Sequence, residues 1–174
     1  MYRNASYWNH TFEEKYFYEQ VMEMADEKFD IDEEKLQQAM ELISDIADLY
    51  ESGGTENEIT VLKQGLEKLT GKTDIDTKAF AEYWAYTSLD TIARSLLMPK
   101  PQKQNLSDEE IRAIILNICE CNYSESENDY YIKLLKMETG LTDLTDYIYY
   151  PNKIGLKLDA EPNDIADKIL LDRK

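Results

Sequence analysis

Histidine and cysteine are scarce in this 174-residue chain, which holds one histidine, His10, and two cysteines. With a single histidine we expect neither a histidine-based catalytic triad nor a two-histidine metal site. Cys119 and Cys121 lie two residues apart on a predicted helix and point to different sides, which suits neither a disulfide nor a shared metal ion. Reduced, structural thiols are therefore expected.

Sequence motifs of catalysis and cofactor binding are also missing. The chain has no HEXXH, Walker A or GXGXXG pattern, and GKTDIDTKAF lacks the central glycine and terminal glutamate of a calcium-binding EF-hand loop. Its carboxylates are spread over helix faces, as on a solvated surface. We predict a protein that is not an enzyme and has no cofactor or metal ion, and an enzyme that uses carboxylates is the weaker alternative.

Long apolar runs are absent as well. No stretch approaches the ~20 apolar residues of a membrane-spanning helix. The N-terminal sequence MYRNASYWNHTFEEKY lacks the apolar run of a signal peptide. We expect a cytoplasmic protein that does not bind membranes.

Basic residues are few relative to acidic ones, at 19 against 36, and the net charge is −17. Such a charge repels nucleic acids and anionic membranes, and it speeds the encounter with a basic partner. A surface that only maintains solubility would have the same composition. The 13 tyrosines favour contact, because tyrosine suits half-buried sites and protein interfaces.

Helical periodicity dominates the sequence, and alternation typical of a strand is not sustained in any segment. The fold class expected is all-α. Apolar spacing, capping residues, glycines and prolines mark the helices. In the helix at 107–119, Ser107 and Glu110 have the spacing of a capping box, and four isoleucines share one face: Ile111, Ile114, Ile115 and Ile118. The expected helices lie at about 16–29, 31–50, 55–69, 88–98, 107–119, 129–139 and 162–171.

Two pairs of segments repeat along the chain in the same order. LTGKTDIDT at 69–77 matches ETGLTDLTD at 138–146 at a constant offset, and TIARSLLM at 91–98 matches DIADKILL at 164–171. These matches predict duplication of a unit of about 70 residues, and chance similarity between acidic helices is the alternative. The expected organisation is an N-terminal helical segment (1–29), a first unit (30–98), a linker (99–106) and a second unit (107–174).

The sequence TDYIYYPN at 145–152 places two adjacent tyrosines before a proline. Neighbouring residues on a helix lie about 100° apart, so at most one of Tyr149 and Tyr150 can point fully into a core. We expect a short helix that Pro151 stops, with an aromatic surface beside the carboxylate of Asp146. Rigid tyrosines next to charge are typical of a protein interface.

The second unit has an acidic helix start, Ile118-Cys119, a Ser/Glu-rich loop at 124–127, a helix that ends in Glu-Thr, and DYIYYP at 146–151. In this order the features resemble the colicin and pyocin DNase immunity proteins, whose most specific signature is DLIYYP. Only its leucine is changed, to Tyr147. The resemblance covers residues 107–171.

This resemblance implies a four-helix domain with a short third helix, and together with the duplication it implies two such units in tandem. A domain of this family binds a basic bacterial nuclease toxin beside its active site and excludes DNA. Carried over by position, the shared contacts are Asp146, Tyr149 and Tyr150, and Pro151 belongs to the same signature. The helix that selects the cognate toxin in the family corresponds to Glu125, Asn128, Asp129 and Ile132. Asn128 and Asp129 depart from the usual family residues, which leaves the partner open.

The first unit matches the family far less well. KAFAEYWAY stands where the signature would be, so Tyr83 and Trp84 are either a second candidate surface or core residues. The alternative to toxin inhibition is an acidic helical adaptor or nucleic-acid mimic that binds another basic protein. A neighbouring gene for a secreted nuclease would favour the first function, whereas an isolated gene would favour the second.

Overall fold

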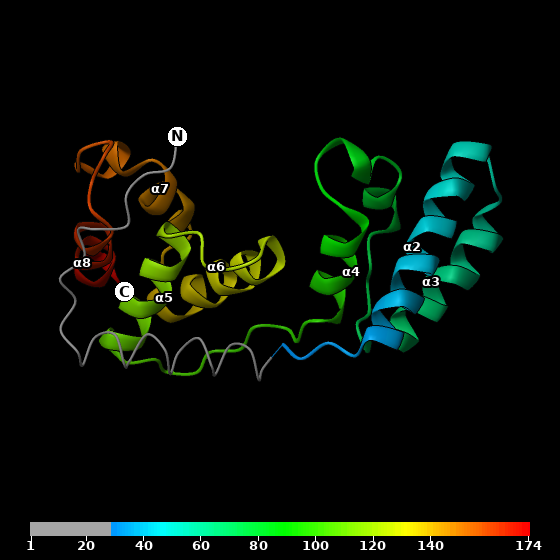
Figure 1. Cartoon of the computed structure of the whole chain (residues 1–174), viewed down its shortest axis with the longest axis horizontal. Helices are drawn as coiled ribbons and strands as arrows, with labels where there is room; N and C mark the ends of the chain where they lie inside the picture. The colour runs from blue at the N-terminus through cyan, green and yellow to red at the C-terminus, as the bar shows by residue number, and fades with distance from the viewer. Residues whose placement is uncertain (1–28) are drawn as a thin grey trace. The chain divides into compact units, whose positions relative to one another are not determined.

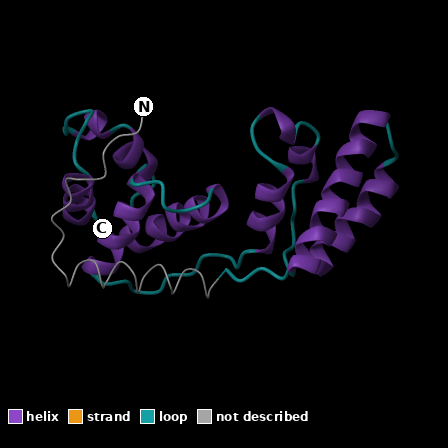
Figure 2. Cartoon of the chain, viewed as in Figure 1, coloured by secondary structure: helices purple, strands orange, loops and turns teal. Residues whose placement is uncertain are grey.

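The computed structural model describes residues 29–174, and every regular element among them is helical (Figures 1 and 2). The all-α prediction is therefore confirmed for these residues. The helix expected at about 16–29 and the N-terminal segment 1–29 lie almost wholly outside the described residues. In chain order the elements are α2 (Glu33–Ser52), α3 (Glu56–Thr70), η1 (Thr77–Phe80), η2 (Tyr83–Ala85), α4 (Leu89–Leu97), α5 (Asp108–Cys119), α6 (Glu125–Thr139), α7 (Leu144–Tyr149), η3 (Pro151–Ile154) and α8 (Pro162–Asp172), where η denotes a 3-10 helix.

The chain divides into two compact units. Among the described residues, one unit, which we call the first-half unit, consists of 31–102 with 123–134, and the other unit consists of 29–30, 103–122 and 135–174. This division differs from the expected consecutive units, because 123–134, with most of α6, group with the first half of the chain. In that unit Tyr130 lines a small cavity together with Pro99 and Lys100.

The core of the first-half unit forms where α2 packs against α3 and α4. Four buried side chains follow the helical spacing of α2, and one residue each from α3, the loop after it, η1 and α4 completes the core: Leu36, Ala39, Ile43, Ile46, Leu66, Ile75, Phe80 and Ala93. The short third helix expected here consists of two 3-10 turns, η1 and η2.

The core of the other unit forms where α5 packs against α8 and α7 packs against α8. The four isoleucines expected on one face of α5 are all buried, and α7 and α8 contribute the remaining apolar side chains: Ile111, Ile114, Ile115, Ile118, Leu144, Ile148, Ile165, Ala166 and Ile169. Ser107 caps α5 through the expected capping box with Glu110.

Helices α3 and α6 each span 15 residues, and both begin and end 69 residues apart. The same capping interactions start them: Thr55 with Glu58 before α3, and Ser124 with Glu127 before α6. In both, the carboxylate accepts a hydrogen bond of 2.8 Å from the backbone N–H of the capping residue. Helix α6 begins at Glu125 rather than near Asp129, so its first turn is formed by polar residues that precede the expected helix.

The last turns of these two helices also match. The hydroxyl of Thr70 donates to the carbonyl of Leu66 at 2.8 Å, and the hydroxyl of Thr139 donates to the carbonyl of Leu135 at 2.7 Å. Leu66 and Leu135 are both fully buried. The constant offset seen in the sequence therefore extends to caps, helix ends and core positions.

Trypsin is expected to cut the chain first after Lys103. Residues 99–106 form no helix and are largely exposed, and the bond after Lys100 resists cleavage because proline follows it. The carboxylate of Glu138 accepts hydrogen bonds from the backbone N–H groups of Gln104 and Leu106 and so restrains the bond after Lys103. Glu138→Ala should then accelerate this cut severalfold, as measured by mass spectrometry of timed digests. A first cut inside α2 or α5 would contradict this prediction.

Candidate protein-binding surface

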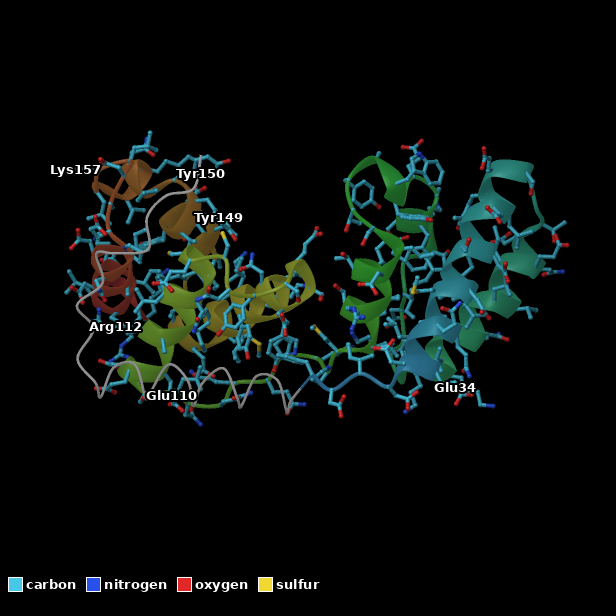
Figure 3. The ribbon with its side chains drawn as sticks, viewed as in Figure 1. Glu34, Glu110, Arg112, Tyr149, Tyr150 and Lys157 are labelled. Carbon is cyan, nitrogen blue, oxygen red and sulfur yellow. The ribbon has the colours of Figure 1, made fainter. Side chains whose placement is uncertain are left out.

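One side of helix α7 is buried in the core, and its C-terminal end is exposed. Leu144, Tyr147 and Ile148 are buried, whereas Tyr149 is 47% exposed and Tyr150 is 52% exposed. Figure 3 marks the two tyrosines where α7 ends. Pro151, which is buried, begins η3 and prevents α7 from continuing, since a proline ring disfavours helical backbone in the preceding residue. Two large aromatic side chains are therefore held next to each other at the surface.

A lysine completes this surface. The ammonium group of Lys153 lies 2.9 Å from Oδ1 of Asp146 and 4.5 Å from the centre of the Tyr150 ring. Two backbone hydrogen bonds fix the turn: the N–H of Tyr150 donates to Asp146, and the N–H of Lys153 donates to Tyr150. Asp146 and Tyr150 together therefore form a site that holds a cation through a carboxylate and a ring face. We call Asp146, Tyr149, Tyr150 and Lys153 the α7 surface.

Tyr147, the residue that departs from the DLIYYP signature, supports this surface from the core. It is only 7% exposed, and its hydroxyl donates to Oδ2 of Asp172 at 2.9 Å. Lys168, followed by Tyr147, lowers the pKa of Asp172, so this acceptor remains ionised. Tyrosine fits at this leucine position because α8 supplies a partner for the hydroxyl.

Tyr147 should lose its proton later than an ordinary tyrosine. Burial, with the nearby Asp172, raises its pKa from 10.0 to about 12. Since the folded-state pKa lies above the unfolded one, the neutral phenol stabilises the fold at neutral pH, and this contribution is lost as the pH rises from about 10 through about 12. Ultraviolet titration of the wild type minus that of Tyr147→Phe should show one tyrosine ionising near this upper value. Ionisation at the ordinary tyrosine pKa would contradict the assignment.

The structure separates the candidate residues of α6 by exposure. Glu125 and Asp129 are exposed, Asn128 is half-buried and Ile132 is 8% exposed. Glu125 accepts a hydrogen bond of 3.3 Å from Thr87, and Asp129 pairs with a lysine one turn later. Because Ile132 is buried, its side chain is not available for a surface contact in the chain as the structure shows it. These four residues belong to the first-half unit, whereas the α7 surface belongs to the other.

The second candidate surface, Tyr83 and Trp84, is partly exposed. Trp84 is 57% exposed, so it is not a core residue. Tyr83 is half-buried, and its ring and the Trp84 ring pack edge to face with their centres 5.6 Å apart. Sequence reasoning missed Tyr86, which is 61% exposed and whose hydroxyl donates to the carbonyl of Ala79. The sequence YWAY, with three aromatic residues in four, was the signal that could have identified it.

The two cysteines of the described residues differ in exposure and reactivity. Burial raises the pKa of the Cys119 thiol to about 11, which keeps it protonated and a poor nucleophile at neutral pH. Cys121 is exposed, and both thiols are free. Within residues 29–174 no group of three histidine, cysteine, aspartate or glutamate side chains is arranged to hold a metal ion.

Comparison of the chain with protein-family models, with curated proteins and with solved structures finds no match. Over the part of the chain that the structure describes, none of the helices has the length and apolar character needed to cross a membrane. The description of the α7 surface therefore depends only on its own geometry: adjacent exposed tyrosines, and a carboxylate paired with the ammonium group of Lys153, on an all-α scaffold.

Proposed function

We propose that this protein is an immunity protein that binds and inhibits a basic bacterial nuclease toxin. The observation that carries the proposal is the α7 surface, where Tyr149 and Tyr150 are both about half exposed next to Asp146. Exposed rigid aromatic side chains beside a carboxylate suit a hot spot, because they bury large area at low entropic cost. The resemblance of residues 107–171 to the DNase immunity proteins supports the same function.

We also propose that the chain consists of two tandem four-helix units of the immunity type. Helices α3 and α6 lie 69 residues apart and share three features: their N-terminal caps, the hydrogen bond from a threonine hydroxyl in the last turn, and the buried leucine that accepts it. This correspondence supports duplication of an ancestral unit. In this proposal α2, α3, η1 with η2, and α4 correspond to α5, α6, α7 and α8.

In the proposed complex the tyrosines pack against the nuclease beside its active site, and the carboxylates meet its basic, DNA-binding groups. The net charge of −17 speeds encounter with such a partner and repels DNA from the complex. Inhibition then requires only bulk and charge, with no cofactor or metal ion from this chain. The site of action is the cytoplasm of the toxin-producing cell.

The test is survival of bacteria that co-express the chain with each member of a panel of toxin nuclease domains. Protection against at least one nuclease, with a complex that co-purifies, is expected. A catalytically inactive form of that nuclease should bind equally well, which separates binding from any effect on toxin expression. If no nuclease in a broad panel is neutralised or bound, the proposal fails.

The acidic charge also favours an adaptor or nucleic-acid mimic that binds another basic protein. The same co-purification separates the two functions. An adaptor would capture basic proteins that lack nuclease activity, and its binding would not depend on the α7 surface.

A further inference from the structure

A groove of about 610 Å³ lies between α2 and α3, in the first-half unit. Leu49, Val61 and Leu62 form its apolar part, and Asp45, Asp48 and Glu58 line it with carboxylates. Val61 is 66% exposed, so its side chain is available to a binding partner. The groove is distinct from the α7 surface and from Tyr83 and Trp84.

The face of α3 that carries Val61 and Leu62 is exposed at Val61, whereas the corresponding face of α6 is buried. The residues 69 positions after Val61 and Leu62 are Tyr130 and Tyr131, which are 4% and 5% exposed. Tyr130 lines a cavity together with Pro99 and Lys100, so a lysine- and proline-containing segment of the chain lies against that face of α6. In α3 the described residues provide no equivalent cover.

Charge identifies the kind of segment that could cover the groove. Of the residues that line it, three are acidic and none is basic. Hydrogen bonds from Thr55 lower the pKa of Glu58, so its charge persists at neutral pH although it also caps α3. A second copy of the chain carries a charge of −17, and residues 1–28 hold six acidic against three basic residues. Neither complements the groove.

We propose that the α2–α3 groove binds a short basic segment of a partner protein. An apolar side chain of that segment packs on Val61 and Leu62, as an anchor residue does in a helix groove. Its lysine or arginine residues pair with Asp45 and Asp48. This second interaction surface does not depend on the α7 surface or on the function proposed for it.

The test uses the full chain, labelled with ¹⁵N, and a peptide of about twelve residues in which leucines at helical spacing alternate with lysines. We expect amide shifts confined to the residues around the groove. A peptide of the same leucine pattern with glutamate for lysine, and a peptide of lysine without leucine, should each bind at least about tenfold more weakly.

Variants with matched controls identify the groove. Val61→Gln should weaken binding at least about tenfold, whereas Leu171→Gln, which removes another exposed apolar side chain at 79% exposure, should not. The pair Asp45→Asn, Asp48→Asn should weaken it similarly, and the pair Asp159→Asn, Asp164→Asn should have no effect. Because all these side chains are exposed or lie at the surface, the variants should remain folded.

Several results would overturn this proposal. They are shifts spread over both units, equal loss in the control variants, or equal binding of the lysine-only peptide, each of which indicates unspecific charge attraction. Shifts at the groove that appear on raising the concentration of the chain alone would instead assign the groove to a second copy. Absence of binding by the leucine–lysine peptide would also reject it.

Discussion

On the proposed function, the double variant Tyr149→Ala, Tyr150→Ala is expected to lose protection against the nuclease toxin while it remains folded. Each single change should weaken the complex by about 2 kcal/mol, or ~30-fold, which is the usual threshold of a hot spot. Stability should change little, because both side chains are about half exposed. Titration calorimetry with the inactive nuclease and thermal unfolding of the free variants separate the two effects.

Buried and distant aromatic residues provide the controls. Tyr147→Ala removes a buried aromatic side chain one turn earlier, so it should lower the free energy of unfolding by ~3–5 kcal/mol. Trp84→Ala removes an exposed aromatic side chain from the first-half unit and should leave the affinity unchanged. If Trp84→Ala weakens binding and the tyrosine variants do not, the contact lies on Tyr83 and Trp84 instead.

Lys153 affects how a basic partner can bind the α7 surface. Its ammonium group occupies the position between Asp146 and the Tyr150 ring that a cation of the partner would take. A basic nuclease therefore has to displace it or bind beside it. This cost is small, since the ion pair is largely exposed and such pairs contribute ~0–1 kcal/mol.

Helix ends could be predicted from the sequence where their signals are local. Thr55 caps α3, Gly71 follows it with left-handed backbone, and Ser107 forms the expected capping box of α5. These interactions join residues three or four apart, so the sequence contains all that they need. The start of α6 was misplaced because Ser124 and Glu127 form the same box inside a segment that looked only polar.

In the candidate site, too, the features that depend on neighbouring residues could be predicted, and those that depend on distant residues could not. The exposure of Tyr149 and Tyr150 follows from adjacency and the proline after them. The position of Lys153 depends on η3, which turns the chain back so that its side chain reaches Asp146. The burial of Ile132 and the hydroxyl bond of Tyr147 come from packing against residues far away in the sequence, which periodicity does not identify.

The paired variants Leu66→Ala and Leu135→Ala should each strongly destabilise the fold and should act in different parts of the molecule. Both leucines are fully buried and occupy matching positions near the ends of α3 and α6. Truncating a buried leucine costs ~2–5 kcal/mol, through lost apolar contact and the cavity that remains.

Native-state amide exchange would locate the loss in each case. Leu66 belongs to the core with α2 and α4, so Leu66→Ala should accelerate exchange in these helices, whereas Leu135 groups with α5, α7 and α8, where Leu135→Ala should act. Val61→Ala, at an exposed position of α3, should change the stability by less than ~0.5 kcal/mol. Equal acceleration throughout α2, α4, α5 and α8 in both variants would mean that the two cores unfold as one cooperative domain, and the independence expected of tandem units would be lost.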